Sequence, residues 1–500
     1  MKFKSKLIKP FANAVARQVD SWKMTAVADQ EFIRQNLVKS AKNTLFGKEN
    51  NFVAIKSAAT FSSIVPLTDY ELIRPYIEKI KSGERDVLWP GQPKYFAKTS
   101  GTTSGAKYIP LTQESMPNHF GTARNALLNY AARSGNYSFF DGKMIFLSGS
   151  PVLDLDGVIP VGRLSGIVNH EIPAWLRKSQ VPSYQTNCID DWETKVDAIV
   201  KETIHKDMSL ISGIPPWVQM YLERLLKQSG KERIIDLFPN LSVFVYGGVN
   251  FSPYRNTLEN LFGRKLDSVE TFPASEGFFA FQDEQGDEGM LLNTKSGIYF
   301  EFIESSRIGE NNPPRFPLED VRMNVPYALV INNNAGLWGY SIGDIVTFIS
   351  IDPYKIVFSG RVAHYISAFG EHVIAKEVED ALLITSASFD CKVSEFTVAP
   401  QVNPPEGGLP YHEWFVEFDQ QPSDINEFIN HLDQQMTVKN IYYKDLIDGH
   451  ILQRLKLRLL KKGSFITYMK QNGKLGGQNK VPRLTNDRKI ADALNQINNS

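Results

Sequence analysis

The sequence predicts an α/β protein: a large N-terminal α/β domain with a β-rich subdomain, followed by a small C-terminal α+β domain. Strands and helices alternate over residues 144–272, a pattern that favours a largely parallel sheet. From Leu291 strands follow one another, and helices return after residue 360. With 500 residues the chain is also too long for one simple core. We therefore expect a large domain over residues 1–360 and a small, mobile domain over 361–500.

Composition indicates an ordinary globular protein, with 42% hydrophobic and 22% charged residues. The formal net charge is zero, so nothing supports nucleic-acid binding, which usually leaves a basic footprint. Cys188 and Cys391 lie far apart and without metal-ligand spacing, so we expect neither structural zinc nor disulfides, and a reducing, cytoplasmic location. No apolar run reaches about 18 residues, so no integral membrane association is expected.

The first 46 residues are predicted to form two helices. In the first helix, apolar residues recur at helical spacing: Leu7, Phe11, Val15 and Val19. This spacing favours an amphipathic helix docked on the protein body, and the basic start of the chain leaves a weak membrane-surface role as the alternative. In the second helix, the apolar stripe consists of Phe32, Ile33, Leu37, Val38, Ala41 and Leu45.

A third helix is expected to begin near Thr68, where Thr68-x-x-Glu71 has the form of a capping box, and to end by Gly83. A short apolar strand end at 95–97 then leads through a loop to a helix over 112–133.

The alternating region contains four predicted strands, at 144–147, 208–211, 241–246 and 267–272. The predicted helices of this region cover 191–206, 215–228 and 252–262. Residues 151–189, rich in glycine and proline, are expected to be irregular. Such a stretch either lines a substrate pocket or connects elements, and the sequence does not distinguish the two.

Beyond Leu291, strands separated by turns of Asn, Pro and Gly are expected at 298–303, 327–331, 345–351 and 356–358. They indicate a β-rich subdomain packed on the α/β core, for which a barrel is one arrangement. In the small domain, the pattern predicts a helix over 375–384, strands over 391–399 and 411–418, and helices over 423–436 and 464–471.

The segment from Lys98 to Lys107 has the composition of a phosphate-binding loop. Its candidate contacts are Ser100, Gly101, Thr102, Thr103, Ser104 and Lys107. Glycines let the backbone turn and approach closely, and N–H groups, hydroxyls and one ammonium can surround phosphate oxygens. A Walker A loop is excluded because the lysine does not directly follow the second glycine, and a dinucleotide fingerprint needs three glycines. A surface turn is the alternative interpretation.

Three later turns carry groups suited to a nucleotide. Gly247-Gly248-Val249 ends a buried strand, where glycines let a flat ring lie against the backbone. Phe272 and Ser275-Glu276 also follow a strand, and a carboxylate such as Glu276 suits Mg²⁺, which takes one or two carboxylates plus phosphates. Asp344, between a glycine and an apolar strand, can accept hydrogen bonds from both ribose hydroxyls. The respective alternatives are a sharp turn, a helix N-cap by Ser275, and a common Gly-Asp turn.

Two positions in the last third of the chain complete the set. Arg361, at the junction to the small domain, is able to hold a ribose or a phosphate. Lys480 follows the flexible pair Gly476-Gly477 and precedes Pro482. In isolation, each is equally well explained as a basic surface residue.

Taken in order, these motifs resemble the adenylate-forming superfamily, which includes acyl-CoA ligases, luciferases and peptide-synthetase adenylation domains. They are most similar to the auxin-responsive acyl acid–amido synthetase family and its bacterial relatives. The matching segments are Thr99-Ser-Gly-Thr-Thr-Ser-Gly, Lys107-Tyr-Ile-Pro, Phe238-Pro-Asn-Leu241, Ala274-Ser-Glu276, Tyr340-Ser-Ile-Gly-Asp344 and Gln478-Asn-Lys-Val-Pro-Arg483. The ordered set, over roughly residues 65–485, is specific although each motif alone is weak.

The resemblance implies an adenylate-forming fold and a two-step ligase reaction that uses ATP and Mg²⁺. A carboxylic acid attacks the α-phosphate of ATP to give an acyl-adenylate and pyrophosphate. An amine, expected to be that of an amino acid, then displaces AMP. The chemistry requires charge stabilisation at phosphorus and exclusion of water from the adenylate.

The resemblance also implies a role for each motif. Ser100, Thr102 and Thr103, with Gly101, Ser104 and Lys107 in the same loop, contact the β- and γ-phosphates. Gly247, Gly248 and Phe272 frame adenine, with Val249 and Ser275 beside them, while Asp344 and Arg361 take the ribose side. Glu276 holds Mg²⁺, and Lys480 bridges the substrate carboxylate and the α-phosphate.

The chain departs from the pattern at three places and leaves two alternatives open. Ser104 is inserted and Ala106 replaces a usual proline relative to acyl-CoA ligases, and His364 stands where many members have a hinge aspartate. An acyl-CoA ligase is the first alternative, because Ser367 to Glu371 corresponds to a CoA-contacting loop. A nucleotide-binding regulatory protein without catalysis is the second. The acid, the acceptor, the acyl-pocket residues and the oligomeric state are not assigned.

Overall fold

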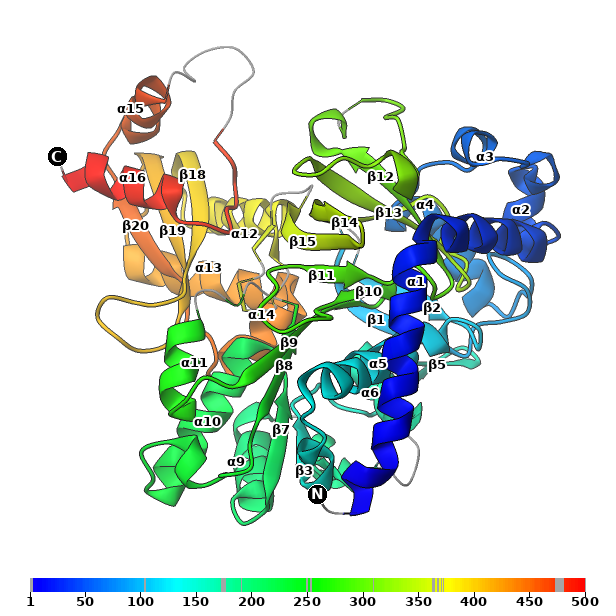
Figure 1. The fold of residues 1–500 in the computed structure, drawn as a ribbon. Helices are drawn as coiled ribbons and strands as arrows, with labels where there is room; N and C mark the ends of the chain where they lie inside the picture. The colour runs from blue at the N-terminus through cyan, green and yellow to red at the C-terminus, as the bar shows by residue number, and fades with distance from the viewer. Residues whose placement is uncertain are drawn as a thin grey trace.

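The computed structural model describes residues 3–102, 105–171, 177–189, 191–248, 251, 254–308, 310–361, 365–366, 368–369, 371, 373–472 and 481–499. A mixed sheet runs through most of the large N-terminal part, in the strand order β12-β13-β14-β15-β11-β10-β9-β8-β7-β3-β6 (Figure 1). Its parallel part comprises β3 (Lys143–Phe146), β6 (Gln180–Val181), β7 (Met208–Ser212), β8 (Val243–Gly247) and β9 (Asp267–Ala274). The parallel core that the alternation predicts is therefore present.

The antiparallel part of this sheet is the β-rich region that the sequence predicts, and it is joined to the parallel strands by hydrogen bonds. It comprises β10 (Gly277–Phe281), β11 (Met290–Leu292), β12 (Ile298–Glu304), β13 (Pro326–Asn333), β14 (Tyr340–Ile351) and β15 (Tyr354–Arg361). Strand β10 pairs with β9, and β11 pairs with β15 through Met290 and Ile356. The barrel expectation is wrong, because these pairings make the strands an extension of the parallel sheet.

Helices cover both faces of the parallel part. On one face lie α9 (Trp192–Thr203), α10 (Pro215–Ser229) and α11 (Arg255–Phe262), which pack on strand residues such as Ile145 and Phe244. On the other face, α5 (Met116–Ser134) and α1 (Phe3–Ala41) pack on Met144, Leu210 and Val243, with η2 (Ser138–Asp141) beside them. Successive strand residues face opposite sides, which is why these strands are apolar throughout.

Helix α1 is a single helix, where the sequence predicts two within the first 46 residues. Of its predicted docking stripe, Val19 is buried, but Leu7 and Phe11 are exposed. The face that docks on the body instead carries Ala12 and Ala16, whose small side chains allow close approach. In the second predicted stripe Phe32 is exposed while Ile33, Leu37, Val38 and Ala41 are buried.

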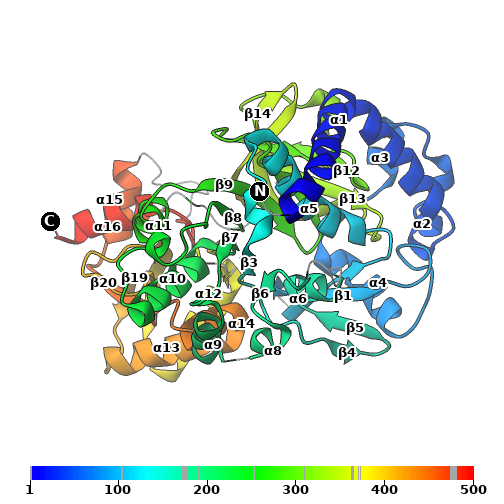
Figure 2. The ribbon, with the colours of Figure 1, turned by 60° about the horizontal axis from the view of Figure 1, so that its bottom comes forward.

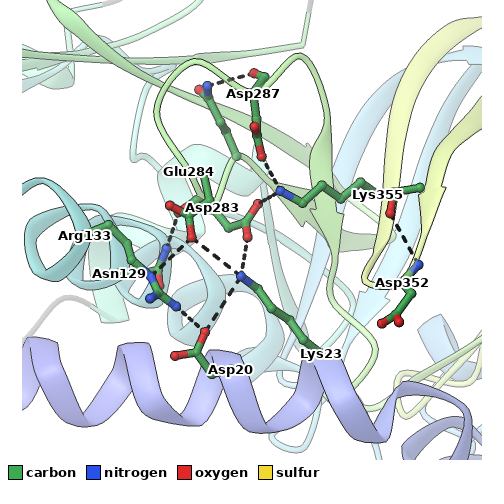
Figure 3. A network of polar contacts seen from close by, with 11 residues as sticks. Asp20, Lys23, Asn129, Arg133, Asp283, Glu284, Asp287, Asp352 and Lys355 are labelled. Atoms are coloured by element: carbon green, nitrogen blue, oxygen red, sulfur yellow. Dashed lines mark hydrogen bonds and ion pairs between the residues drawn. The ribbon is translucent and has the colours of Figure 1, made fainter.

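A network of buried charges fastens α1 to the sheet (Figure 3). The fully buried Asp283, which follows β10, accepts from the ammonium groups of Lys23 on α1, at 2.6 Å, and Lys355 on β15, at 2.9 Å. Burial opposes the charge on Lys355, but the Asp287 and Asp283 carboxylates outweigh it and raise the pKa of Lys355. Asn129 of α5 donates to the Asp283 carbonyl at 2.8 Å, so three elements meet at one residue.

The N-terminal helices continue with α2 (Leu45–Glu49), η1 (Phe52–Ala54), α3 (Ala58–Ile64) and α4 (Tyr70–Lys81). The capping box predicted at Thr68 is wrong by one residue. Asp69 is the N-cap and accepts from the Leu72 N–H at 3.0 Å, whereas the Thr68 hydroxyl donates to the Trp338 carbonyl at 2.7 Å. That bond ties α4 to the segment just before β14.

A second sheet, in the order β2-β1-β5-β4, contains β1 (Tyr95–Thr102), β2 (Gly105–Leu111), β4 (Asp154–Asp156) and β5 (Ile159–Gly162). The predicted phosphate loop is therefore the end of a β-hairpin rather than a strand-to-helix loop. The region 151–189, expected to be irregular, also contains α6 (Leu164–Glu171) and α8 (Tyr184–Asn187). Strand β5 pairs in parallel with β1, so this region supports the hairpin.

The C-terminal part is built on a third sheet, β18 (Lys392–Gln401), β19 (Tyr411–Gln420) and β20 (Lys456–Leu460). Its helices are α12 (Ala375–Ser388), α13 (Ile425–Lys439), α14 (Ile441–Asp448), α15 (Ser464–Gln471) and α16 (Lys489–Asn499). The α+β prediction is confirmed, although α14, β20 and α16 were not predicted. In Figures 1 and 2 this part lies beside α10 and α11, on the side away from α1.

The remaining elements are short: η3 (Ile234–Asp236), η4 (Ser305–Arg307), η5 (Leu318–Asp320) and the paired β16 (Tyr365–Ile366) and β17 (Val373–Ile374). None of the helices in the described part of the chain combines the length and the apolar character that crossing a bilayer requires.

Candidate nucleotide and acyl site

One cleft of about 3130 Å³ brings seven of the predicted site residues together. It is lined by Lys107, Gly247, Gly248, Phe272, Ser275, Glu276 and Asp344. These residues come from β2, β8, β9, the turn after β9, and β14. The ends of strands separated by more than 200 residues in the sequence thus face one space, as expected at the carboxyl edge of an α/β sheet.

Some predicted residues cannot be placed in full. Thr103, Ser104, Val249, His364 and Lys480 lie outside the described residues. For another four, only the backbone is described: Ser100, Gly101 and Thr102 belong to the end of β1, and Arg361 to the end of β15.

The base of the β1–β2 hairpin is held in place by helix α4. Lys98 pairs with Tyr108 and Thr99 with Lys107 across the two strands. The Tyr108 N–H donates to the Tyr70 hydroxyl of α4 at 2.9 Å, and the Lys81 ammonium lies 4.0 Å from the centre of the Tyr108 ring. Burial raises the pKa of Tyr70 to about 12, so its phenol stays neutral. The base of the predicted phosphate loop is thereby fixed on a helix.

Glycine is required at position 247 for a steric reason. Strand β8 pairs there with Thr271 of β9, and a Cβ on Gly247 would lie 2.3 Å from the Thr271 carbonyl oxygen. At Gly248 the space is open, but the backbone φ of +82° is one that side chains rarely adopt. The turn therefore presents bare backbone to the cleft, next to the Phe272 ring.

Ser275 and Glu276 form the two-residue turn between β9 and β10, where Ala274 pairs with Gly277. The helix N-cap interpretation of Ser275 is therefore wrong. The buried Asn333 of β13 donates its amide to the Glu276 carbonyl at 2.9 Å and so fixes the turn. Burial, and then the Glu276 charge, raise the pKa of Tyr340 well above its ordinary value, which indicates that the carboxylate faces the first residue of β14.

Asp344 is buried at the start of β14 and lines the cleft. It pairs in register with Arg361 at the end of β15. Gly343 and Gly360 flank this pair with φ of +83° and +140°, and neither has an atom within 4 Å of where a Cβ would stand. The two glycines leave room beside the carboxylate for a bulky group from solvent.

A metal ion in this part of the cleft would have few protein ligands. Within the described residues, no three His, Cys, Asp or Glu side chains gather where they could hold a metal ion. A magnesium ion bound mostly by phosphates and water needs only one or two protein carboxylates, so Glu276 in the cleft fits such an ion.

The C-terminal part contributes one wall of the cleft. Pro482, Thr485 and Tyr468 line it. The chain from residue 481 is fastened to β18, because the Val398 N–H donates to the Arg483 carbonyl at 2.9 Å and the Thr485 N–H donates to the Val398 carbonyl at 3.0 Å. The described chain thus resumes at the cleft directly after Lys480.

A direct contact also joins the two parts. Arg163, between β5 and α6, pairs with Asp445 of α14, and its guanidinium lies 5.1 Å from the centre of the Tyr442 ring. Both Arg163 and Tyr442 line the cleft.

The loop that would meet CoA in acyl-CoA ligases contains a buried carboxylate. Glu371 accepts from the Phe369 N–H at 2.8 Å and lies 2.8 Å from Nε2 of the buried His412. Its carboxylate therefore shapes the loop and is not exposed to an acceptor. Ser367 and Gly370 of this loop lie outside the described residues.

Sequence reasoning missed a row of residues in the floor of the cleft. Phe146, Ser212 and Val245 are register neighbours on β3, β7 and β8, and all three line the cleft. They are only half-buried although they sit in the middle of a covered sheet. An apolar chamber therefore lies between this row and α5, at the end of β3 and β7 and two residues before the end of β8. The small polar Ser212 at the end of the strand Met208–Ser212 is the signal that could have indicated it.

His119 on α5 was also missed. It is buried, lines the cleft, and among the described residues its Nδ1 has no hydrogen-bond partner. Burial lowers its pKa to about 4, so the imidazole is neutral at physiological pH. A single histidine within a helix carries no sequence pattern that distinguishes it from a core residue.

A parallel sheet that ends in glycine turns, with a β-hairpin on one side of the cleft and a small α+β unit on the other, is the architecture of the adenylate-forming ligases. Solved structures agree on the fold. GH3.15 acyl acid amido synthetase matches with a TM-score of 0.61 at 16% identity, over 96% of this chain and 95% of that chain. A 2-hydroxyisobutyryl-CoA ligase with 2-HIB-AMP and CoA matches with 0.60 at 14% identity, over 95% and 92%.

Within that class, the chain belongs to the GH3 family. The GH3 family N-terminal domain matches residues 16–186 and 150–266, the central domain 291–361 and the C-terminal domain 376–489. Similar proteins include the probable indole-3-acetic acid-amido synthetase GH3.1 of Arabidopsis thaliana, 22% identical over 94% of this chain and 91% of that protein. Jasmonoyl--L-amino acid synthetase JAR4 of Nicotiana attenuata is 22% identical over 87% and 86%.

Proposed function

We propose that the protein is an ATP-dependent, AMP-forming acyl acid–amido synthetase. It adenylates a carboxylic acid and then transfers the acyl group to an amine, that of an amino acid. The observation that carries the proposal is the convergence of the β1–β2 hairpin, the β8 and β9 turns and Asp344 on one cleft. The names of the GH3 relatives, which are amido synthetases of acyl acids, support the same reaction.

The nucleoside is proposed to bind between the turn after β8 and Asp344 of β14. The bare backbone of Gly247 and Gly248, with the Phe272 ring beside it, offers a flat surface for adenine. Asp344 is able to accept hydrogen bonds from the ribose hydroxyls. Gly343 and Gly360, next to the Asp344–Arg361 pair, leave room for the ribose. Arg361 is proposed to act from the neighbouring strand end.

The phosphates are proposed to lie between the hairpin and the Ser275-Glu276 turn. Backbone N–H groups and the hydroxyls of Ser100, Thr102 and Thr103, together with Lys107, would hold the β- and γ-phosphates. Mg²⁺, held by Glu276 and the phosphates, would neutralise charge there. The carboxylate of the acid then meets the α-phosphate at the strand ends, beside the chamber over Phe146, Ser212 and Val245.

Lys480 is proposed to be the catalytic residue of the first step. The chain after it is fastened to β18, so its backbone moves with the C-terminal part. An ammonium delivered between the substrate carboxylate and the α-phosphate would stabilise the charge that develops in the transition state. We propose that residues 361–500 act as the mobile domain that delivers it, a type of motion that often limits turnover.

The test is ATP–pyrophosphate exchange supported by a panel of carboxylic acids. Removing one well-placed stabilising group typically costs about 10²–10³ in rate, so Lys480→Ala is expected to lose at least that much while ATP still binds. Lys462→Ala serves as the matched control, because Lys462 is 76% exposed and forms an ion pair with Asp419 on the surface. Equal exchange by the Lys480→Ala variant and the parent would contradict the role.

The acceptor is tested separately. Amino acids, other amines and CoA are offered to the adenylate, and the products are identified by mass. Amide products with no thioester support the proposal, whereas release of AMP that depends on a thiol would make the protein an acyl-CoA ligase. The buried position of Glu371 favours the amine, because it removes one polar group from the loop that would meet CoA.

A further inference from the structure

The proposed acyl chamber continues into an apolar trough that runs back from the strand ends. On β3, Met144 and Phe146 both face α5 and both line the cleft, and Phe140 of η2 continues the same surface. Two residues on one face of a strand are separated by about 7 Å. The cleft therefore extends well past the point where a carboxylate would meet ATP.

One wall of the trough is a face of α1. The residues of this helix that line the cleft are Lys4 at its start, then Leu7, Ile8, Phe11, Ala14, Val15 and Gln18. They recur every three or four positions, which places them on one face, and that face adjoins the Ala12, Ala16 and Val19 face that docks on the core. From Leu7 to Gln18 this wall is about 16 Å long.

The opposite wall comes from α5 and α6. Phe120, Leu127 and Leu128 of α5 and Leu164 and Val168 of α6 line it. At the far end, the Lys4 ammonium of α1 donates to the Ser179 hydroxyl at 2.8 Å, so the helix is attached across the end of the trough.

Two large apolar side chains of this wall are more than half exposed. Leu7 is 54% exposed and Phe11 is 69% exposed, although both face the cleft. They lie four residues apart on one helix face and form the outer edge of the trough. Such a contiguous apolar surface marks a ligand-binding groove rather than scattered surface residues.

We infer that the acid substrate carries a long, flexible apolar tail, which lies along β3 between α1 and α5. The inference rests on the proposed adenylation. A compact aromatic acid would fill the chamber over Ser212 and leave the α1 wall uncovered, whereas a straight hydrocarbon tail would bury the chamber and the trough together. Neutral His119 at the inner end places no charge beside that tail.

The test compares straight-chain saturated acids of increasing length with benzoate and phenylacetate, by pyrophosphate release. Burial of one methylene is worth a factor of roughly four, so kcat/KM is expected to rise by about that factor per methylene until the trough is full. In the Leu7→Ser/Phe11→Ser double variant, the ratio of kcat/KM for the longest to the shortest acid is expected to fall at least tenfold, by loss of apolar contact.

Met24→Ser is the matched control, since Met24 is on the same helix and 85% exposed, but does not line the cleft. It should keep the parental ratio. If compact aromatic acids are the best substrates and chain length has no effect, the inference is overturned while the adenylation itself stands.

A second measurement keeps the inference testable if no acid supports pyrophosphate release, a result that would refute the proposed function. Displacement of a fluorescent long-chain carboxylate by dodecanoate is followed with three full-length proteins: the parent, Met24→Ser and the double variant. Binding by the parent and Met24→Ser, weakened at least tenfold in the double variant, supports the trough. Equal binding by all three, or none by the parent, overturns it.

Discussion

Replacing His119 by glutamine is expected to remove part of the acid sensitivity of the fold. Burial lowers the pKa of His119 to about 4 from 6.5. A histidine with a lowered pKa in the folded state binds its proton more tightly in the unfolded chain. Its contribution to stability is therefore complete above pH 6.5 and is lost as the pH falls through that value toward 4. Glutamine stays neutral over the same range.

The magnitude follows from the two pKa values of His119. Their difference of about 2.5 corresponds to roughly 3 kcal/mol at a pH below 4, and about 2 kcal/mol of this is lost between pH 7 and pH 5. Urea unfolding, followed by tryptophan fluorescence, measures the free energy of unfolding at both pH values. The parent should lose about 2 kcal/mol more than His119→Gln between them.

The quantity compared is the loss of unfolding free energy between pH 7 and pH 5 in each protein. It separates the titration of His119 from any packing defect that the substitution introduces, because a packing defect lowers stability equally at both pH values. His205→Gln is the control, since His205 is exposed. If the parent and His119→Gln lose the same free energy between pH 7 and pH 5, burial does not keep the imidazole neutral and the reasoning fails.

Two further predictions concern the frame of the site. Gly247→Ala would put a Cβ 2.3 Å from the Thr271 carbonyl oxygen, so we expect a loss of about 1–3 kcal/mol by urea unfolding together with weaker ATP binding by calorimetry. Gly121→Ala, in the middle of α5 with no atom closer than 4.0 Å, should be neutral or stabilising, and equal behaviour of the two variants would contradict the steric argument. Asp283→Asn leaves two lysines without their shared buried carboxylate and should cost about 3–5 kcal/mol in the same unfolding assay. Glu284→Gln, on the exposed side of that network, should cost less than about 1 kcal/mol, and a similarly small loss for Asp283→Asn would refute the anchoring role.

Local patterns predicted the helices well where one face is buried and the other is exposed. Helix α15 has the predicted bounds, and α10 differs from them by one residue. The pattern misled on α1, because Leu7 and Phe11 face an open cleft and not the core. An apolar side chain at helical spacing indicates a non-aqueous neighbour, but it does not say whether that neighbour is protein or ligand.

Pairing between distant strands could not be predicted. The segment of Ser, Thr, Gly and Lys around Thr99 has no apolar alternation, and it forms a strand because it pairs with β2, while β5 pairs with Phe96 and Ala97 earlier in the same strand. The pairing of Met290 with Ile356 is likewise invisible in either segment, and it is what turned an expected barrel into an extended sheet. The candidate site residues were proposed from their chemistry and order; seven of them line the cleft, and their roles stay predictions. The row of Phe146, Ser212 and Val245 in the floor of the cleft was not predicted, because in the sequence Phe146 and Val245 cannot be distinguished from core residues.

The separation of the two sheets has a consequence for how the proposed nucleotide site tolerates change. The turns after β8 and β9, and Asp344 within β14, belong to one hydrogen-bonded sheet, whereas the β1–β2 hairpin belongs to another. A hairpin at the edge of a small sheet is able to open locally without breaking the larger one. Changes in the length of this hairpin are therefore absorbed by the hairpin alone. The part of the fold that would hold the nucleoside and the part that would hold the phosphates can accordingly diverge at different rates.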